Sequence, residues 1–63
     1  MYYYEVWYGV QMLHTDSGFE TREEAIEEAE MYRDSKINDY EIDGAEYELS
    51  EFTIVTDLEE EVW

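Results

Sequence analysis

The chain has 63 residues, of which 19 are acidic and three are basic, giving a formal charge of −16 at pH 7. A chain of this length forms one small domain without a deep catalytic cleft, because it buries only about 60% of its unfolded surface. Phosphates repel so much negative charge, which excludes direct nucleic-acid binding. The expected partner is a positively charged surface, very often that of a protein that itself binds nucleic acid.

The rest of the composition excludes further classes. Hydrophobic residues make up 44% of the chain and aromatic residues 17%, enough for a folded core rather than a disordered chain. The absence of cysteine excludes a disulfide framework and a thiolate metal site, and it fits a reducing cytoplasm. No long apolar run, signal peptide or basic amphipathic face is apparent, so we expect a cytoplasmic protein without a membrane partner.

Residues 2–13 alternate well enough to predict a strand. The side chains expected to face the core are Tyr2, Tyr4, Val6, Tyr8, Val10 and Met12. Those expected to face outward are Tyr3, Glu5, Trp7, Gly9, Gln11 and Leu13. Gly9 is expected at a bulge or bend, so one long strand and a shorter strand with a kinked continuation both fit. Residues 14–18, HTDSG, predict a turn in which His14 is a surface residue.

Residues 21–36, TREEAIEEAEMYRDSK, predict one amphipathic helix. Thr21 is the expected N-cap, and Glu24 stands three residues later to complete a capping box. The apolar residues that recur at helical spacing and mark the buried stripe are Ala25, Ile26, Ala29 and Tyr32. We expect the helix to end near residues 36–38, with Asn38 as its C-terminal cap.

The side of this helix opposite to the apolar stripe carries almost nothing but carboxylates. They are Glu23, Glu27, Glu30 and Asp34, with Glu24 and Glu28 beside them. Ordinary solvated faces mix both signs, since like-charge pairs four residues apart destabilise a helix by about 0.2–0.5 kcal/mol each. The basic residues Arg22, Arg33 and Lys36 fall on the core side or its margin, and the last two are expected in the final turn. We therefore interpret the acidic side as a binding surface.

Residues 39–43 predict a second strand with Tyr40 and Ile42 facing inward. Asp43-Gly44 is a hairpin signal, and a third strand is expected to begin at Ala45. Packing the helix on one face of an antiparallel sheet of about three to four strands buries both apolar stripes. The sequence therefore predicts an α+β domain in β-α-β-β order, spanning residues 1–63. Its open sheet face would carry a second acidic set, Glu5, Glu41, Asp43, Glu46 and Glu48.

The apolar pattern changes phase near the C-terminus, where Phe52 and Ile54 continue it one residue out of step. A bulge or short turn at residues 50–51 is expected to account for this change. Residues 57–63 fit either a frayed helical turn or a loose tail. For Tyr3 and Trp7 three alternatives stay open: they are binding anchors on the open face, they are covered by a dimer partner or the tail, or the strand register is reversed.

Residues 39–44 also resemble the start of a calcium-binding EF-hand loop, with the right acid spacing and a glycine at the sixth position. The twelfth position, which requires a bidentate Glu, is Ser50, so a hairpin turn is the favoured interpretation and no metal or other cofactor is expected. Catalysis by paired carboxylates requires a desolvated member, and His14 has no nucleophile beside it. We therefore expect no enzyme activity.

A very short, very acidic, cysteine-free chain with a capped Glu-rich helix and an acidic hairpin resembles the DNA-mimic inhibitors made by phages and mobile elements, including small anti-CRISPR proteins. The resemblance rests on composition and charge placement over the whole chain. It implies an inhibitor that occupies the basic DNA-binding groove of a nucleic-acid-binding protein, for which a CRISPR effector complex is one candidate. The expected partner-binding residues are Glu23, Glu24, Glu27, Glu30, Asp34, Glu41, Asp43, Glu46 and Glu48.

Two other interpretations stay open. The first is an acidic halophilic or housekeeping domain whose carboxylates hold water and cations in high salt. The second is an interaction module that dimerises through the face carrying Tyr3 and Trp7. A monomer or a weak homodimer is expected for the inhibitor.

Overall fold

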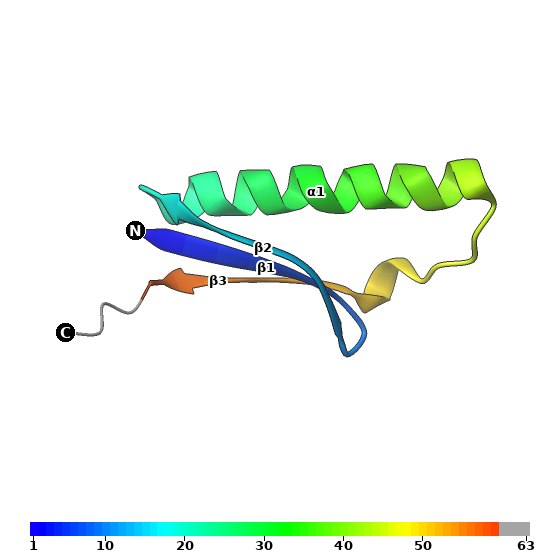
Figure 1. Cartoon of the computed structure of the whole chain (residues 1–63), viewed down its shortest axis with the longest axis horizontal. Coiled ribbons are helices and arrows are strands. Elements are labelled where there is room, and N and C mark those ends of the chain that lie inside the picture. Colours follow the sequence, from blue (N-terminus) through cyan, green and yellow to red (C-terminus); the bar gives the residue numbers. More distant parts are fainter. Residues whose placement is uncertain (60–63) are drawn as a thin grey trace.

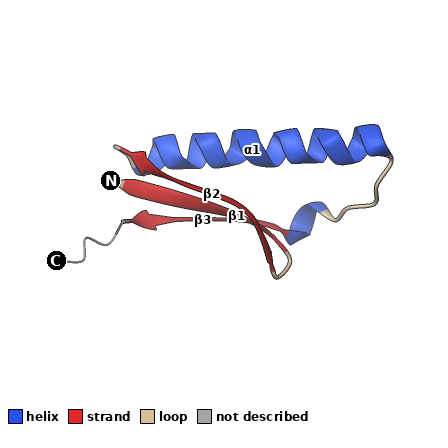
Figure 2. Ribbon diagram, in the orientation of Figure 1, coloured by secondary structure: helices blue, strands red, loops and turns tan. Residues whose placement is uncertain are grey.

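The computed structural model describes residues 1–59, which form one helix packed on a three-stranded antiparallel sheet (Figure 1). The strands are β1 (Tyr2–Tyr8), β2 (Gln11–Phe19) and β3 (Phe52–Leu58), in the spatial order β2-β1-β3. The helix α1 (Arg22–Asp43) lies along one side of the sheet, and a single 3-10 turn, η1 (Leu49–Glu51), leads into β3 (Figure 2). The predicted α+β class is therefore confirmed, but the order of elements is β-β-α-β.

The first segment is a hairpin and not one long strand. Gly9, at a φ of +59°, and Val10 form a two-residue turn, a conformation that glycine adopts without a steric penalty. The Gly9 N–H also donates a hydrogen bond to the carbonyl of Glu51 (3.0 Å). The predicted turn at residues 14–18 was wrong, since these residues belong to β2 and pair with β1. Propensity favoured a turn there, but pairing with an adjacent strand overrides it.

The predicted inward alternation holds in β1 and fails after the turn. Tyr4 and Val6 are buried as expected, whereas Val10 is 97% exposed and Met12 is also exposed. Leu13, which was expected outward, packs against the core. The cause is the two-residue turn, which pairs the inward Tyr8 with Gln11 and the outward Trp7 with Met12, so that Met12 lies on the outward face.

The helix begins as predicted and ends later than predicted. The Thr21 hydroxyl accepts a hydrogen bond from the Glu24 N–H (3.2 Å), which confirms the N-cap. The C-cap is Gly44 in the left-handed conformation (φ +70°), so Asp43-Gly44 is a helix end and Asn38 is not the cap. The predicted strand over residues 39–43 was wrong for the same reason. A glycine with positive φ serves both hairpin turns and helix ends, so the dipeptide alone does not distinguish them.

The fully buried core is small and lies where the N-terminal half of α1 crosses β1. It consists of Tyr4, Val6, Ala25 and Ala29. The half-buried residues packed around it are Tyr2, Leu13, Phe19, Tyr32 and Ile54. The two alanines let the helix backbone approach the sheet closely, since they add little side-chain volume between the layers.

A second cluster, of aromatic side chains, holds the C-terminal half of α1. Tyr8 and Phe52 pack edge to face with ring centroids 5.0 Å apart. The ring centroid of Tyr40 lies 5.9 Å from that of Tyr47, 6.2 Å from that of Phe52 and 6.3 Å from that of Tyr8. The centroids of Tyr47 and Phe52 are 6.4 Å apart. Tyr40 therefore continues the sheet-facing stripe of the helix. The predicted strand starting at Ala45 was also wrong, since residues 45–48 form an irregular segment.

The predicted short turn at residues 50–51 is confirmed as η1, after which Phe52 and Ile54 turn toward the helix side. Of the predicted tail, Asp57 and Leu58 belong to β3. Residues 60–63, including Trp63, lie outside the described residues.

Candidate partner-binding surface

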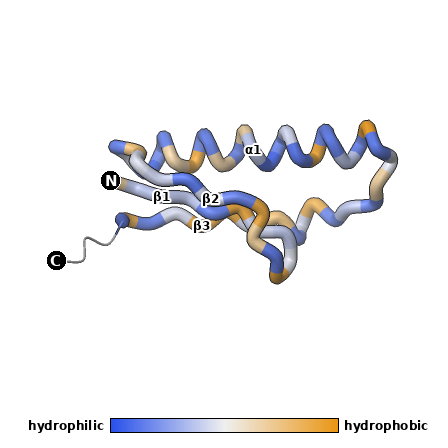
Figure 3. The backbone as a smooth tube through the Cα atoms, in the orientation of Figure 1, coloured by the Kyte–Doolittle hydropathy of each residue, from blue (hydrophilic) through white to orange (hydrophobic). Residues whose placement is uncertain are grey.

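Five exposed carboxylates of α1 lie on its side away from the sheet, and we call them the acidic row. They are Glu23, Glu27, Glu30, Asp34 and Glu41. Their spacings of 4, 7, 11 and 18 residues all return to nearly the same side of an α-helix, opposite to the buried alanines. At 1.5 Å per residue the acidic row is about 27 Å long. Hydrophilic residues recur on every turn of α1 in Figure 3.

Because the helix is longer than predicted, two predicted site residues do not lie where they were expected. Glu41 and Asp43 were expected on the open sheet face, but both belong to the last turn of α1, and Glu41 extends the acidic row. The helix as a whole carries nine carboxylates over about 33 Å, or one per about 4 Å of axis. One strand of duplex DNA carries one phosphate per roughly 3.4 Å. Counted over all its sides, the helix thus approaches the linear charge density of one strand.

Few basic side chains lie close to the acidic row. Arg33 is half-buried and its guanidinium donates two hydrogen bonds to Asp34 Oδ1, at 3.2 and 3.3 Å. Lys36 is half-buried on the sheet side, and the guanidinium carbon of Arg22 lies 5.7 Å from the Tyr2 ring centroid. Among residues 1–59, Arg33 and Asp34 form the one ion pair, so the other four members of the acidic row have no basic side chain paired with them there.

The charges at the two ends of α1 act in opposite directions. Glu23 and Glu24 lie in the first turn, where they stabilise the helix dipole. Glu41 and Asp43 lie in the last turn, which contains no basic residue, and there each carboxylate destabilises the helix by about 0.3–1 kcal/mol. The prediction of Arg33 and Lys36 in the last turn was wrong because the helix continues beyond them. Folding alone does not favour acidic residues at this end.

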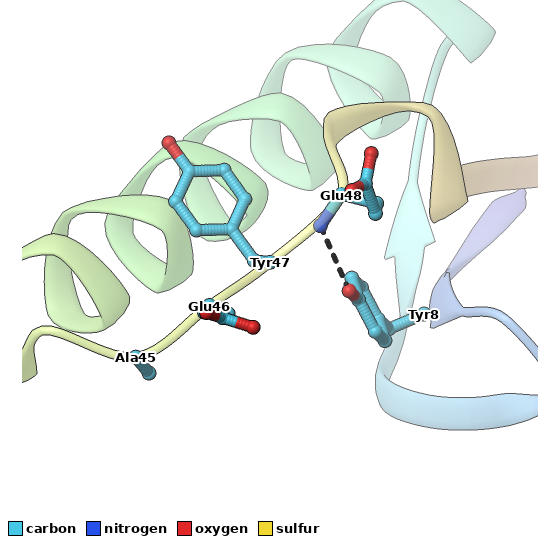
Figure 4. A pocket seen from close by; sticks show the side chains of 5 residues that line it. All are labelled: Tyr8, Ala45, Glu46, Tyr47 and Glu48. Atoms are coloured by element: carbon cyan, nitrogen blue, oxygen red, sulfur yellow. Dashed lines mark hydrogen bonds between the residues drawn. The ribbon is translucent and has the colours of Figure 1, made fainter.

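The remaining predicted site residues, Glu46 and Glu48, line an open hollow beside the end of the helix (Figure 4). Its volume is about 730 Å³, and its other lining residues are Tyr8, Ala45 and Tyr47. The Tyr8 hydroxyl accepts a hydrogen bond from the Glu48 N–H (2.9 Å), which anchors this segment to the end of β1 (Figure 4). The structure therefore brings Glu46 and Glu48 near the C-terminal end of the helix and not to the open sheet face.

The open sheet face is much less acidic than expected. From β1 and β3 it presents Tyr3, Glu5, Trp7, Thr53, Val55 and Asp57, as cross-strand pairs. Trp7 and Tyr3 are half-buried there, and the Trp7 Nε1–H donates to Glu5 Oε1 (3.0 Å). Because that carboxylate is already engaged, this face is a poor second acidic surface.

His14 is not a surface turn residue. Its ring stacks on Tyr32 of α1, with centroids 4.4 Å apart and planes 15° apart, and it also meets Tyr4 at 5.8 Å. Burial raises the pKa of Tyr4, and the charges of Asp16 and Glu28 raise it further. The ring contacts with Tyr32 and Tyr4 give His14 a role in packing, which its position among polar, turn-forming residues in the sequence does not indicate.

Residues 1–59 contain neither a metal-binding cluster nor a membrane-spanning helix. That part of the chain holds no group of three or more His, Asp or Glu side chains arranged to bind a metal ion. It also holds no helix with the length and apolar character needed to cross a membrane. Comparison of the chain with known protein families, with curated proteins and with solved structures gives no match.

Proposed function

We propose that this protein is a DNA-mimic inhibitor, of the kind that includes anti-CRISPR proteins. It occupies the basic DNA-binding groove of a nucleic-acid-binding protein and so blocks DNA binding. The observation that carries the proposal is the acidic row, five exposed carboxylates aligned along about 27 Å of one helix. In this role the protein works in the cytoplasm of an infected or host bacterial cell.

The charge geometry supports imitation of one DNA strand and not of a whole duplex. An α-helix with its side chains is about 10–12 Å across, and the acidic row occupies only one side of it. The carboxylates of Glu23, Glu27 and Glu30 stand in for successive phosphates against Lys and Arg side chains of the partner. Glu24, Glu46 and Glu48 lie beside the row or at its C-terminal end and widen the contact.

The placement of charge also supports a partner-binding role over a purely solvated surface. Like charges within the acidic row repel one another, and Glu41 and Asp43 oppose the helix dipole. Binding to a basic groove offsets both the repulsion within the acidic row and the unfavourable interaction of Glu41 and Asp43 with the helix dipole. Association is then steered by charge, so it is fast at low salt and weakens steeply as ionic strength rises.

The test is capture on immobilised protein from bacterial lysate, with salt elution and competition by duplex DNA. We expect a nucleic-acid-binding protein that is retained at low ionic strength and is released by duplex DNA. The variant Glu23→Lys, Glu27→Lys, Glu30→Lys should lose this capture and should no longer block DNA binding by the captured protein, while its thermal unfolding stays cooperative.

The matched control reverses three exposed acids outside α1, namely Asp16, Glu51 and Asp57, and changes the net charge by the same amount. It should retain capture and inhibition. If both triple variants lose binding equally, net charge and not the acidic row is responsible. If the helix variant still inhibits, the helix is not the site and the hollow at Glu46 and Glu48 becomes the candidate.

A further inference from the structure

The two edges of the sheet differ in how well they are protected against pairing with another strand. β2 departs from regular pairing with β1 at two places. β3 pairs with β1 over all seven residues without a register shift. Bulges discourage edge pairing, whereas an edge strand with regular pairing is open to it.

The hydrogen-bond alternation shows which groups of β3 point outward. The Gly9 N–H donates to the Glu51 carbonyl and the Glu59 N–H to the Met1 carbonyl, so odd-numbered residues of this ladder bond to β1. In an antiparallel pair the alternate residues direct both backbone groups away from the neighbour. The outward residues of β3 are therefore Phe52, Ile54, Thr56 and Leu58.

Two of the four outward N–H groups already have acceptors. The Phe52 N–H donates to the Leu49 carbonyl within η1, and the Leu58 N–H donates to Asp57 Oδ1 (2.8 Å). Ile54 and Thr56 remain, because the ladder alternation directs their N–H groups away from β1 and no turn, cap or side-chain hydrogen bond within residues 1–59 uses them. The open donors of this edge are therefore two residues apart, on either side of Val55.

We propose that β3 pairs with β3 of a second copy of this chain, antiparallel about a two-fold axis at Val55. In this register Ile54 faces the partner's Thr56 and Thr56 faces the partner's Ile54, so each outward N–H meets an outward carbonyl. Four backbone hydrogen bonds form, and the two sheets join into one of six strands. The two-fold axis is perpendicular to the sheet, so both α1 helices lie on the same side of it.

The side chains of β3 are compatible with pairing to themselves. Asp57 is the one charged residue among the seven of β3, and in this register it faces the partner's Thr53 and not another charge. Val55, 38% exposed, meets the partner's Val55 at the close, non-hydrogen-bonded position, where β-branched pairs are favourable. Leu58, 53% exposed, faces the partner's Phe52 and becomes covered.

The same observations favour a second copy over a different partner. A cationic protein is drawn to the acidic row, and β3 has almost no charge with which to recruit it. A second copy meets the two open donors of β3 with its own two outward carbonyls when the strands pair about a two-fold axis at Val55. The proposal does not depend on the DNA-mimic function, and it predicts the opposite salt dependence. Two chains of charge −16 repel each other, so screening by salt strengthens the dimer.

The test is sedimentation equilibrium of the full chain at 0.15 M and 1 M KCl over a range of concentrations. We expect a monomer–dimer equilibrium that shifts toward dimer at 1 M KCl. Val55→Glu places two like charges opposite each other and should weaken the dimer about 10-fold or more. The control Val10→Glu makes the same charge change at the fully exposed hairpin turn and should leave the equilibrium near that of the native chain.

Backbone hydrogen exchange gives a second reading that does not depend on a variant. The Ile54 and Thr56 amides should become protected as concentration rises, while the Val55 amide, bonded to β1, is protected at every concentration. A monomer at all concentrations in 1 M KCl would overturn the proposal. So would a dimer that forms without protection of Ile54 and Thr56, which would place the contact elsewhere, for example at Tyr3 and Trp7.

Discussion

The Tyr47 hydroxyl donates a hydrogen bond to Glu41 Oε1 (2.9 Å) and ties the segment after α1 back to the last turn of the helix. The bond places an aromatic ring from the hollow against the end of the acidic row. It also settles the position of residues 45–48, which have no regular structure of their own. Its chemical consequence is a shifted proton equilibrium on the phenol.

This contact predicts a measurable change in the titration of Tyr47. The hydrogen bond to Glu41, followed by desolvation and the carboxylate charge, raises the pKa of Tyr47 above its ordinary value of 10.0. A raised tyrosine pKa stabilises the fold below pH 10, and this contribution is lost as pH rises through the folded-state pKa. We expect the Tyr47 ring carbon, followed by NMR, to titrate later than a free tyrosine. Glu41→Gln should move the midpoint back toward 10.0, and an unchanged midpoint in that variant would contradict the assignment.

The dipole of α1 predicts opposite effects for neutralising a carboxylate at its two ends. Asp43→Asn removes a negative charge from the last turn and should raise the free energy of unfolding by about 0.3–1 kcal/mol. Glu23→Gln makes the same charge change in the first turn and should lower it by a similar amount. Urea denaturation of the two variants beside the native chain measures both. Equal and same-signed shifts would indicate that general self-repulsion, and not the dipole, governs these positions.

The helix end at Gly44 predicts a penalty that depends on backbone conformation alone. No heavy atom lies within 4 Å of a Cβ added at Gly44, but its φ of +70° disfavours a side chain. Gly44→Ala should therefore destabilise the chain by about 1–2 kcal/mol. Gly44→Asn should cost less, because Asn tolerates the left-handed region better than Ala. Thermal unfolding of both variants checks this order, which a helix ending near Asn38 would not produce.

Salt dependence of folding separates the proposed inhibitor from a halophilic domain. We expect the native chain to be folded at about 0.1 M KCl and its Tm to rise moderately toward 1 M, where the Debye length falls from about 10 to 3 Å and screens self-repulsion. Circular dichroism melts across this range provide the measurement. A chain that is unfolded below molar salt would instead support the halophilic interpretation.

Local signals in the sequence determined the start of the helix, its acidic side and the inward side of β1. Thr21 caps the helix, and Glu23, Glu27 and Glu30 follow the helical period from there. Tyr4 and Val6 are buried as their alternation predicts. These features depend on residues a few positions apart, so backbone period and side-chain capping decide them without knowledge of the rest of the fold.

Only the tertiary structure decided where the helix ends, which strands pair and where several of the carboxylates lie. Residues 39–43 have a pattern that fits a strand or a helix, and packing of Tyr40 against Tyr8 and Phe52 stabilises the helix. Because this packing keeps residues 39–43 helical, Glu41 belongs to the acidic row. The local sequence of residues 14–18 favours a turn. In the structure His14 stacks on Tyr32 and the segment pairs with β1, so these residues form a strand. Contacts between residues far apart in the chain outweigh local propensities of a few tenths of a kcal/mol, and those contacts exist only in the folded molecule.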